Sequence, residues 1–573
     1  MEHPPEKTLF LSGDEALAQG AWEQGLKAAC SYPGTPASEI LEYLARLPEV
    51  DAQWSVNEKV AFEVALGSAI AGLRSIYSSK HVGLNVAMDP LMTSAYTGVN
   101  AGFVVVFADD PGIHSSQNEQ DTRIFARAAK LPLLEPSSAR EAKDLMKTAF
   151  EISEGFDTPV LVRLTTRVAH AKENMTVSPR VEAPARSLRV DIQKYVMVPG
   201  NAYRKHLSLE KKLLDLRDYA ERSPLNRAEM GDTSIGFVTS GISYQYIKEM
   251  FPDASVLKLG MTYPFPEKMA RAFSEKVSRV CVIEELEPFL EGQLREAGIV
   301  CSGKPASYRV GELRPEYIPQ IVEGKEKVEE PFTSRKPVMC PGCPHRALFW
   351  QLKKAKVVVA GDIGCYTLGA LPPLSSLHAC LCMGGGVTLF EGFRKVSKDT
   401  VGVLGDSTFV HSGVTGLINL AYNGTKGVLV ILDNSTTAMT GSQPNPATGF
   451  TAKGVKTKRL SLEELCKVCG ADNVDVVNPF DVQATEKIVR KRMAEDKLSV
   501  IISRSPCKLI DRSRGPVPQL DREACRKCGI CLSLNCPGLS KGEDGKVELN
   551  AELCAGCNLC AEVCACGALK KRS

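Results

Sequence analysis

The sequence predicts an α/β protein with three successive parallel-sheet domains followed by a small cysteine-rich domain. Three observations lead to this prediction. Apolar runs of strand length, such as residues 104–107 and 160–162, alternate with helical stretches, which is the rhythm of a parallel α/β sheet. The same alternation starts again near residue 233 and near residue 337. Nine of the twenty cysteines fall between positions 525 and 566, which sets the C-terminal segment apart.

Changes in composition give the expected domain boundaries. A polar, charged, proline-containing stretch at residues 191–230 is predicted to be a linker or irregular extension, and a charged stretch at 323–337 the next boundary. Later strands are expected at 235–239, 280–283, 357–360, 401–404 and 428–432. We therefore predict a first domain at 1–190, the linker or extension at 191–230, a second domain at 231–325, a third at 335–512 and the cysteine-rich domain at 515–573.

Composition excludes several classes of function. A net charge of +3 over 573 residues gives no sign of the basic surface that binds nucleic acid. No segment approaches the eighteen or so apolar residues of a membrane helix, and the N-terminal residues lack the pattern of a signal peptide. We therefore expect a cytoplasmic protein. In a reducing compartment, clustered cysteines indicate metal ligation rather than a disulfide scaffold.

Eight of the C-terminal cysteines form two closely spaced runs. The runs are Cys525, Cys528, Cys531 and Cys536, then Cys554, Cys557, Cys560 and Cys564. A cubane iron–sulfur cluster needs four thiolates, and in two-cluster ferredoxins the fourth cysteine of each run ligates the other cluster. This rule predicts one [4Fe-4S] cluster on Cys525, Cys528, Cys531 and Cys564, and a second on Cys536, Cys554, Cys557 and Cys560.

The two runs depart from the ferredoxin pattern in two places. Four residues instead of three precede Cys536, and Ala565 rather than proline follows Cys564. A pair of zinc sites is the alternative, because Cys-x2-Cys also suits zinc. Eight cysteines in a double run favour clusters. Cys566 is a spare cysteine by this count.

Two polar side chains follow neighbouring apolar strands of the third domain. Asp406, in Gly405-Asp406-Ser407, follows residues 401–404, and Asn434 follows residues 428–432. Oxygen ligands at adjacent strand ends can hold Mg²⁺ against a diphosphate. The 28-residue distance resembles the thiamine-diphosphate motif, although Gly-Asp-Ser alone is a common turn. The resemblance implies thiamine diphosphate bound at Gly405, Asp406 and Asn434, with Mg²⁺ on Asp406, Asn434 and the Thr436 carbonyl oxygen.

Glycine-rich loops and one carboxylate support a thiamine site. The loops at residues 361–365 and 383–386 allow backbone amides to approach phosphates closely. Thiamine diphosphate also needs a carboxylate beside its aminopyrimidine ring, and Glu58, before an Ala/Gly-rich helix, is the candidate in the first domain. By residue type alone, a glutamate in the first turn of a helix is explained by the helix dipole.

Taken together, the modules resemble the thiamine-dependent 2-oxoacid:ferredoxin oxidoreductases, and within them the alpha subunits of the indolepyruvate branch. The resemblance covers essentially the whole chain. It rests on Ser-Tyr-Pro-Gly-Thr-Pro at 31–36, the Asp-Asp-Pro-Gly-Ile-His segment at 109–121, Cys-Pro-Gly-Cys-Pro-His at 340–345 and the cysteine-rich tail. It implies two thiamine-type domains, a transketolase-C-like domain and a ferredoxin-like domain. It also implies that Glu58 is the aminopyrimidine partner, Thr35 a substrate contact, and Arg127, ahead of Arg123, the carboxylate-binding arginine.

The activity that the resemblance implies is oxidative decarboxylation of indolepyruvate and similar arylpyruvates. Coenzyme A would be the acyl acceptor and ferredoxin the electron acceptor, with a smaller beta subunit in an α2β2 assembly. Three alternatives stay open: a pyruvate, 2-oxoglutarate or branched-chain oxidoreductase, a non-oxidative thiamine-dependent decarboxylase or ligase, and an electron-transfer subunit. Nothing in spacing or periodicity selects aromatic substrates.

A third cluster is also considered, on Cys340, Cys343, Cys365 and Cys507. The first two form another Cys-x2-Cys pair, Cys365 closes the loop at 361–365, and Cys507 follows a strand-like run at 498–503. Similarly placed cysteines hold a cluster near thiamine in sibling oxidoreductases. A zinc site or free, buried thiols are the alternatives.

Overall fold

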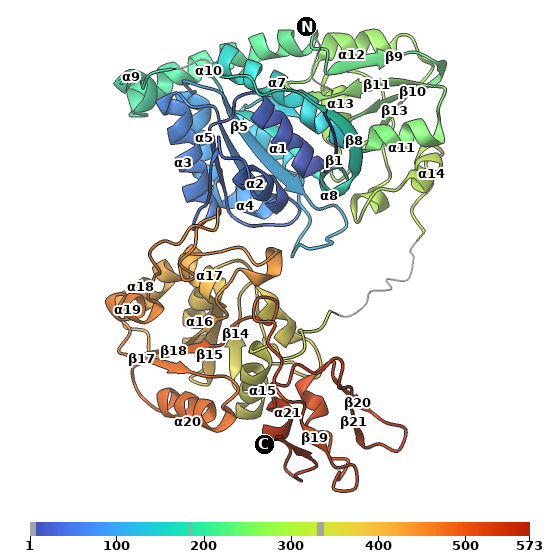
Figure 1. Cartoon of the computed structure of the whole chain (residues 1–573). Helices are drawn as coiled ribbons and strands as arrows, with labels where there is room; N and C mark the ends of the chain where they lie inside the picture. The colour runs from blue at the N-terminus through green and yellow to red at the C-terminus, as the bar shows by residue number, and fades with distance from the viewer. Residues whose placement is uncertain (1–6, 184–185, 189, 329–336, 573) are drawn as a thin grey trace. The chain divides into compact units, whose positions relative to one another are not determined.

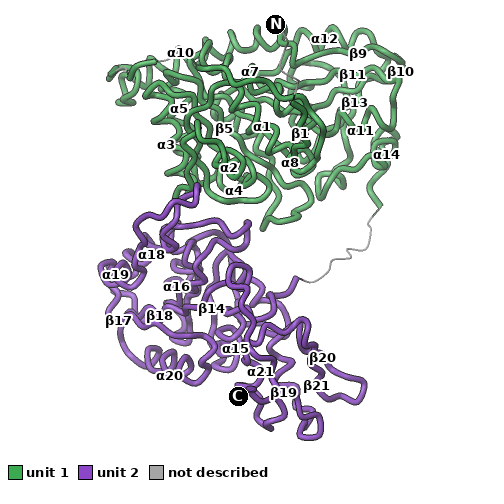
Figure 2. Tube along the Cα trace, in the orientation of Figure 1, with its two compact units in different colours: residues 1–331 green, residues 332–573 purple. Residues whose placement is uncertain are grey.

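The computed structural model describes residues 7–183, 186–188, 190–328 and 337–572. The chain forms two compact units, residues 1–331 and 332–573 (Figure 2), and each is described by itself. The division falls inside the boundary stretch predicted at 323–337. No helix in these described ranges combines the length and apolarity needed to cross a membrane.

A seven-stranded sheet forms the centre of the first unit, in the order β12-β6-β7-β5-β4-β2-β3. All neighbouring strands run parallel except β12, which is antiparallel to β6. The strands are β2 (Ala28–Ser31), β3 (Asp51–Trp54), β4 (Ser75–Lys80), β5 (Phe103–Asp109), β6 (Leu133–Leu134), β7 (Val160–Thr165) and β12 (Met261–Tyr263).

Both faces of this sheet are buried under helices (Figure 1). In β5, Val104 and Val106 belong to one apolar cluster, while Val105 and Phe107 belong to another. This alternation is what a strand covered on both faces requires, and it explains the continuous apolar run. The helices are α1 (Gly13–Glu23), α2 (Ser38–Ala45), α3 (Glu58–Ala71), α4 (His81–Val86), α5 (Met88–Thr97), α6 (Arg123–Ala129), α7 (Ala139–Gly155) and α8 (Thr166–His170).

A second sheet completes the first unit, in the order β13-β10-β11-β9. Its first three strands in this order are parallel, and β9 adds an antiparallel edge. A separate antiparallel pair joins β1 (Lys7–Ser12) and β8 (Lys172–Val177). The second-sheet strands are β9 (Asn226–Glu229), β10 (Asp232–Thr239), β11 (Ala254–Leu259) and β13 (Val280–Ile283), with helices α11 (Ser243–Met250), α12 (Glu267–Ser274), α13 (Phe289–Glu296) and α14 (Ile318–Val322).

The predicted linker at 191–230 is instead largely regular structure. It contains α9 (Ile192–Tyr195), the 22-residue α10 (Pro199–Ala220) and β9. Proline stands in the first turn of α10, where its missing N–H costs nothing. Leu209, Leu216 and Ala220 are buried against the first domain. Most charged residues of α10 are exposed, and their number hides this narrow apolar stripe in the sequence.

A five-stranded, wholly parallel sheet forms the second unit, in the order β14-β15-β16-β18-β17. Val428 and Val430 of β16 face one apolar cluster, and Leu429 and Ile431 face another, so helices cover both faces. The strands are β14 (Val358–Ala360), β15 (Thr400–Gly405), β16 (Gly427–Asp433), β17 (Asn473–Val477) and β18 (Leu498–Arg504), and the helices α15 (His345–Ala355), α16 (Gly385–Arg394), α17 (Asp406–Thr408), α18 (Val414–Tyr422), α19 (Leu462–Val468) and α20 (Val482–Met493).

The cysteine-rich tail is small and packs against α15 within the second unit. Its regular structure includes two antiparallel strand pairs, a 3-10 turn at Leu532–Leu534 and a short α-helix. Ala347 and Val482 of the sheet domain share one apolar cluster with Leu534 and Leu559 of the tail. The tail elements are β19 (Gln519–Leu520), β20 (Leu539–Lys541), β21 (Val547–Leu549), α21 (Leu559–Glu562) and β22 (Leu569–Lys570).

Candidate functional site

Four polar residues follow four adjacent strands at one edge of the large sheet in the first unit. Thr35 follows β2, Glu58 follows β3, Lys80 ends β4 and Asp110 follows β5. Because these strands are parallel neighbours, their carboxyl ends lie at the same edge. Ligands of open α/β sheets bind at this edge. Two of the four, Thr35 and Glu58, are residues that the sequence predicts.

Glu58 begins α3 and is 7% exposed. Asn57 caps the helix, with its Oδ1 accepting from the Val60 amide at 2.9 Å. A Cβ added at Gly83 in α4 would lie 2.7 Å from the Glu58 carboxylate, so glycine there allows the two elements to approach. Glu58 is therefore both at the start of a helix and buried. The helix dipole explains a glutamate at a helix start, but it does not explain why that glutamate is buried.

Thr35 lies beside the segment at 109–121. The Ser115 hydroxyl donates to the carbonyl oxygen of Thr35 at 3.2 Å. Asp110 organises this segment by accepting from the Ser115 amide at 2.8 Å and from the Ser116 hydroxyl at 2.6 Å. Burial raises the pKa of Asp110, but the hydrogen bonds from Ser116 and Ser115 outweigh it and hold that pKa below the usual value. The Asp110 carboxylate is therefore ionised.

Lys80 is a functional candidate that sequence reasoning missed. Its side chain is buried, and Nζ donates to the carbonyl oxygen of Ser115 at 2.8 Å and to its hydroxyl at 3.0 Å. Burial lowers the pKa of Lys80 to about 8, against the opposing effect of Asp110. Lys80 ends β4, a strand that is wholly buried although most of its residues are polar. The sequence therefore has no apolar run that predicts this strand.

The two arginines considered as ligands of the substrate carboxylate each form an ion pair with an acidic side chain of the chain itself. Arg127 is 46% exposed and its Nη2 donates to both oxygens of Glu296, at 2.9 and 2.8 Å. Arg123 is fully buried and pairs with Asp121 at 2.5 Å and with Glu284 at 2.8 Å. The assignment of Arg127 to the substrate stays a prediction, and Arg123 holds the first domain to the β13–α13 segment.

In the second unit, Asp406 and Asn434 follow the adjacent parallel strands β15 and β16, as the sequence predicts. Asp406 is 2% exposed, and its Oδ1 accepts from the Ser407 amide at 2.7 Å. Its Oδ2 is buried and has no hydrogen-bond partner among the described residues. Burial, and then the charge of Asp433, raise the pKa of Asp406 to about 7. An orphaned carboxylate oxygen of this kind fits a cation.

The turn after β16 fixes the side chain of Asn434. Ser435 adopts a left-handed φ of 60°, and Asn434 Oδ1 accepts from the Thr436 amide at 3.2 Å. Asn434 Nδ2 lies 3.4 Å from Nε2 of His345. Burial lowers the pKa of His345 to about 4, so its imidazole is neutral. The Cys-Pro-Gly-Cys-Pro-His segment and the predicted magnesium ligand are therefore direct neighbours.

The glycine loops are held by a carboxylate that the sequence did not single out. Asp362 accepts from the Gly384 amide at 3.1 Å and from the Gly386 amide at 2.8 Å. A Cβ at Gly386 would lie 2.7 Å from the Val403 carbonyl oxygen, so this close approach requires glycine. The amides of Gly384 and Gly386, which were expected from the sequence to face phosphates, thus donate hydrogen bonds to Asp362.

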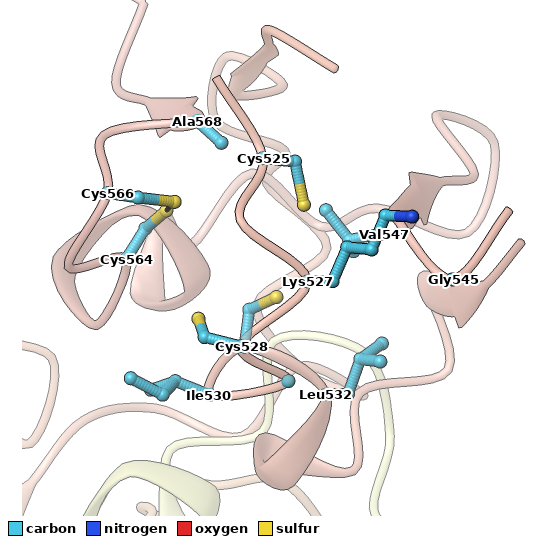
Figure 3. Close-up of a pocket in the computed structure, with 12 residues that line it drawn as sticks. Cys525, Lys527, Cys528, Ile530, Leu532, Gly545, Val547, Cys564, Cys566 and Ala568 are labelled. Atoms are coloured by element: carbon cyan, nitrogen blue, oxygen red, sulfur yellow. Dashed lines mark hydrogen bonds between the residues drawn. The ribbon is translucent and has the colours of Figure 1, made fainter. Parts of the chain in front are cut away.

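The first predicted quartet lines one hollow in the tail. Cys525, Cys528, Cys531 and Cys564 all line this hollow. Figure 3 shows Cys525, Cys528 and Cys564 around it. Cys566 lines the same hollow, with its Sγ 3.7 Å from Sγ of Cys564. The spare cysteine is therefore beside this site rather than apart from it.

The second predicted quartet lines a separate hollow. Cys536, Cys554, Cys557 and Cys560 all line it. Cys343 and Arg346, from the Cys-Pro-Gly-Cys-Pro-His segment and α15, complete its wall. The two quartets thus separate as the crossed ligation rule predicts, and the second one borders the sheet domain.

Each of the four cysteines considered for a third cluster lies near at least two of the others. Burial raises the pKa of the Cys343 thiol to about 12, and Cys365 and Cys340 add to this effect. Burial raises the pKa of Cys365 to about 11, with further contributions from Cys507 and Cys340. The Cys507 amide donates to the Asn434 carbonyl oxygen at 2.9 Å. The set therefore lies at the carboxyl edge of the sheet, beside Asn434.

Two family models match the two units. Residues 19–205 match the thiamine-diphosphate-binding domain of pyruvate flavodoxin/ferredoxin oxidoreductases, and residues 362–503 match the C-terminal binding domain of thiamine pyrophosphate enzymes. The second range contains Asp406 and Asn434, and the first contains Thr35 and Glu58. Fold and site together define a thiamine-dependent 2-oxoacid oxidoreductase.

Relatives that match nearly the full length of the chain indicate which family within this class it belongs to. Indolepyruvate oxidoreductase subunits IorA are 38% identical in Pyrococcus horikoshii, over 100% of this chain and 98% of theirs, and 39% identical in Methanothermobacter thermautotrophicus, over 98% and 97%. The chain belongs to the indolepyruvate oxidoreductase IorA family. A 2-oxoglutarate synthase subunit KorA from Archaeoglobus fulgidus is 26% identical over 55% of this chain and 99% of its own. A Magnetococcus marinus 2-oxoglutarate:ferredoxin oxidoreductase structure matches 56% of this chain and 66% of its own, at 17% identity and a TM-score of 0.49.

Proposed function

We propose that this chain is the catalytic subunit of an enzyme that oxidatively decarboxylates indolepyruvate and similar arylpyruvates. The acyl group passes to coenzyme A, carbon dioxide leaves, and the electrons pass through iron–sulfur clusters to ferredoxin. The observation that carries the proposal is the full-length relationship to indolepyruvate oxidoreductase subunits, at 38% identity over nearly all of both chains. The residues of the two units support the same reaction.

Thiamine diphosphate and Mg²⁺ fit the carboxyl edge of the second unit. Asp406, Asn434 and the carbonyl oxygen of Thr436 would hold the metal, since Asp406 has a buried oxygen without a partner. When bound, the cofactor supplies the nucleophile and the electron sink for cleavage next to a keto group. Glu58 would hold a proton at the aminopyrimidine ring, and Thr35 would contact the substrate carboxylate. Gly405 would lie at the diphosphate, and a Cβ there would come within 3.0 Å of the Tyr366 ring.

The cysteine-rich tail would form a ferredoxin-like domain with two [4Fe-4S] clusters. Its support is the arrangement of the eight cysteines in two quartets, each around its own hollow. A third cluster on Cys340, Cys343, Cys365 and Cys507 would lie between the cofactor edge and the second quartet. Its support is the position of Cys507 next to Asn434 and of Cys343 in the wall of the second hollow. Together the clusters would give electrons a route out of the sheet domain.

The partners follow from the reaction class. We propose a smaller beta subunit in an α2β2 assembly, ferredoxin as electron acceptor, and coenzyme A and a 2-oxoacid as substrates. The test is a steady-state comparison of indolepyruvate, phenylpyruvate, pyruvate, 2-oxoglutarate and a branched-chain 2-oxoacid with the complex purified without oxygen. Arylpyruvates should have the highest kcat/KM. A higher kcat/KM for pyruvate or 2-oxoglutarate would contradict the proposed preference for arylpyruvates.

A further inference from the structure

Arg346 is a buried cation where the sheet domain of the second unit meets the cysteine-rich tail. It lies in the first turn of α15 and is 2% exposed. Its Nη1 donates to the carbonyl oxygen of Leu534 at 2.7 Å and to that of Asn535. Its Nη2 donates to the carbonyl oxygens of Met339 at 2.7 Å and Cys340 at 3.0 Å. One guanidinium therefore joins the loop before α15 to the tail.

The charge of Arg346 has no carboxylate counterpart in the described part of the chain. Its four acceptors are all backbone carbonyl oxygens, and its Nε has no hydrogen-bond partner among the described residues. The buried Arg123 and Arg163, in contrast, each pair with two carboxylates. Taking an ion out of water costs several kcal/mol unless an opposite charge compensates. The compensating charge of Arg346 has to come from another source.

The surroundings of Arg346 indicate that source. It lines the hollow that Cys536, Cys554, Cys557 and Cys560 surround. Cys343, from the loop before α15, lines the same hollow as Arg346 and Cys557. Arg346 therefore lies near thiols on the sheet-domain side and on the tail side.

We propose that Arg346 sets the reduction potential of the cluster on Cys536, Cys554, Cys557 and Cys560 by acting as its buried counter-charge. The inference rests on the proposed function, in which this quartet holds a [4Fe-4S] cluster. A cubane with four thiolates is negatively charged, and accepting one electron from the 2-oxoacid oxidation makes it more so. Net charge and hydrogen bonding set such potentials. A fixed cation in a medium of low dielectric constant stabilises the reduced form more than the oxidised form. Arg346 is thus a positioning residue that acts through the cluster.

The test is a redox titration of the complete complex, followed by electron paramagnetic resonance, for wild type and Arg346→Gln. Iron and acid-labile sulfide are measured on the same samples. At the wild-type midpoint potential, the ratio of reduced to oxidised cluster should fall by about tenfold in Arg346→Gln, a shift of about 59 mV for one electron. The other tail cluster should titrate as in wild type.

Two further variants separate charge from mechanical attachment. Trp350 lies on the same helix, and its Nε1 donates to the Ser533 hydroxyl of the tail at 2.9 Å. Trp350→Phe removes this attachment without changing the charge, so the potential should not move. Arg346→Lys keeps the charge but loses most of the four carbonyl contacts, and should restore most of the wild-type potential. It also provides the test if Arg346→Gln does not retain its iron.

Three results would overturn the inference. They are an unchanged potential in iron-replete Arg346→Gln, an equal shift in Trp350→Phe, or a full tenfold change in iron-replete Arg346→Lys. Absence of iron and sulfide from the wild-type tail is a different result. It would contradict the proposed cluster domain itself, and it is distinguishable because it appears before any variant is compared.

Discussion

The Nζ of Lys80 lies 2.8 Å from the carbonyl oxygen of Ser115, and the Ser115 hydroxyl donates in turn to the carbonyl oxygen of Thr35. Three segments that are far apart in the sequence are thereby held at one edge of the sheet. A buried ammonium at this edge can attract a substrate carboxylate and also fixes the segment beside Thr35. Neither role depends on Arg127, whose guanidinium is on the surface with Glu296.

Lys80→Met should therefore weaken substrate binding more than it slows the chemical step. We expect the KM for the 2-oxoacid to rise by about tenfold or more, since hydrogen bonds to charged groups contribute about 1.5–3 kcal/mol, with a smaller change in kcat. Lys147→Met, at an exposed lysine on α7, is the control. Because the pKa of Lys80 is about 8, the wild-type ammonium loses its proton above that pH. The KM should then rise with pH in wild type but not in Lys80→Met. An unchanged KM in Lys80→Met would remove Lys80 from the site.

Glu58→Gln tests the carboxylate proposed to face the aminopyrimidine ring. The amide keeps the size of the side chain but cannot exchange a proton as the carboxylate does. Turnover should fall by at least ~100-fold, the low end of general acid–base contributions, while iron content stays unchanged. Glu63→Gln, one turn further along α3 and exposed, should keep wild-type turnover. Equal turnover for the two variants would leave Glu58 as a helix-start residue.

Asp406→Ala removes the buried oxygen proposed to bind Mg²⁺. Isothermal titration calorimetry should show loss of Mg²⁺-dependent thiamine diphosphate binding, with iron and sulfide as in wild type. The control is Asp399→Ala, at an exposed aspartate just before β15. Wild-type cofactor affinity in Asp406→Ala would end this assignment.

Cys365→Ser tests the third cluster in the complete chain. With three clusters the anaerobically purified protein should contain about twelve irons per chain, and the variant about eight. The alternative, free thiols or a zinc site, predicts about eight irons in both proteins. Cys382→Ser, at an exposed cysteine of the same unit, should leave the iron content unchanged.

Prediction from sequence succeeded where one physical constraint dominates. The strand expected at 280–283 coincides with β13, because a strand buried on both faces must be continuously apolar. The spacing of the eight cysteines predicted which thiols share a hollow. The segment at 191–230 was predicted wrongly, because the apolar stripe of α10 is narrow among many charges. Lys80 was missed for a related reason: the strand before it is polar, and only tertiary packing buries it.

The measurement that tests the account most directly is the stoichiometry of the complete reaction. The chain and its smaller partner subunit would be purified together without oxygen and given indolepyruvate, coenzyme A, thiamine diphosphate, Mg²⁺ and ferredoxin. The account predicts two ferredoxins reduced by one electron each, or one reduced by two, for every carbon dioxide and every indoleacetyl-CoA formed, with no reduction when coenzyme A or thiamine diphosphate is left out. Carbon dioxide released at the same rate without ferredoxin reduction would contradict it, since the enzyme would then be a non-oxidative decarboxylase.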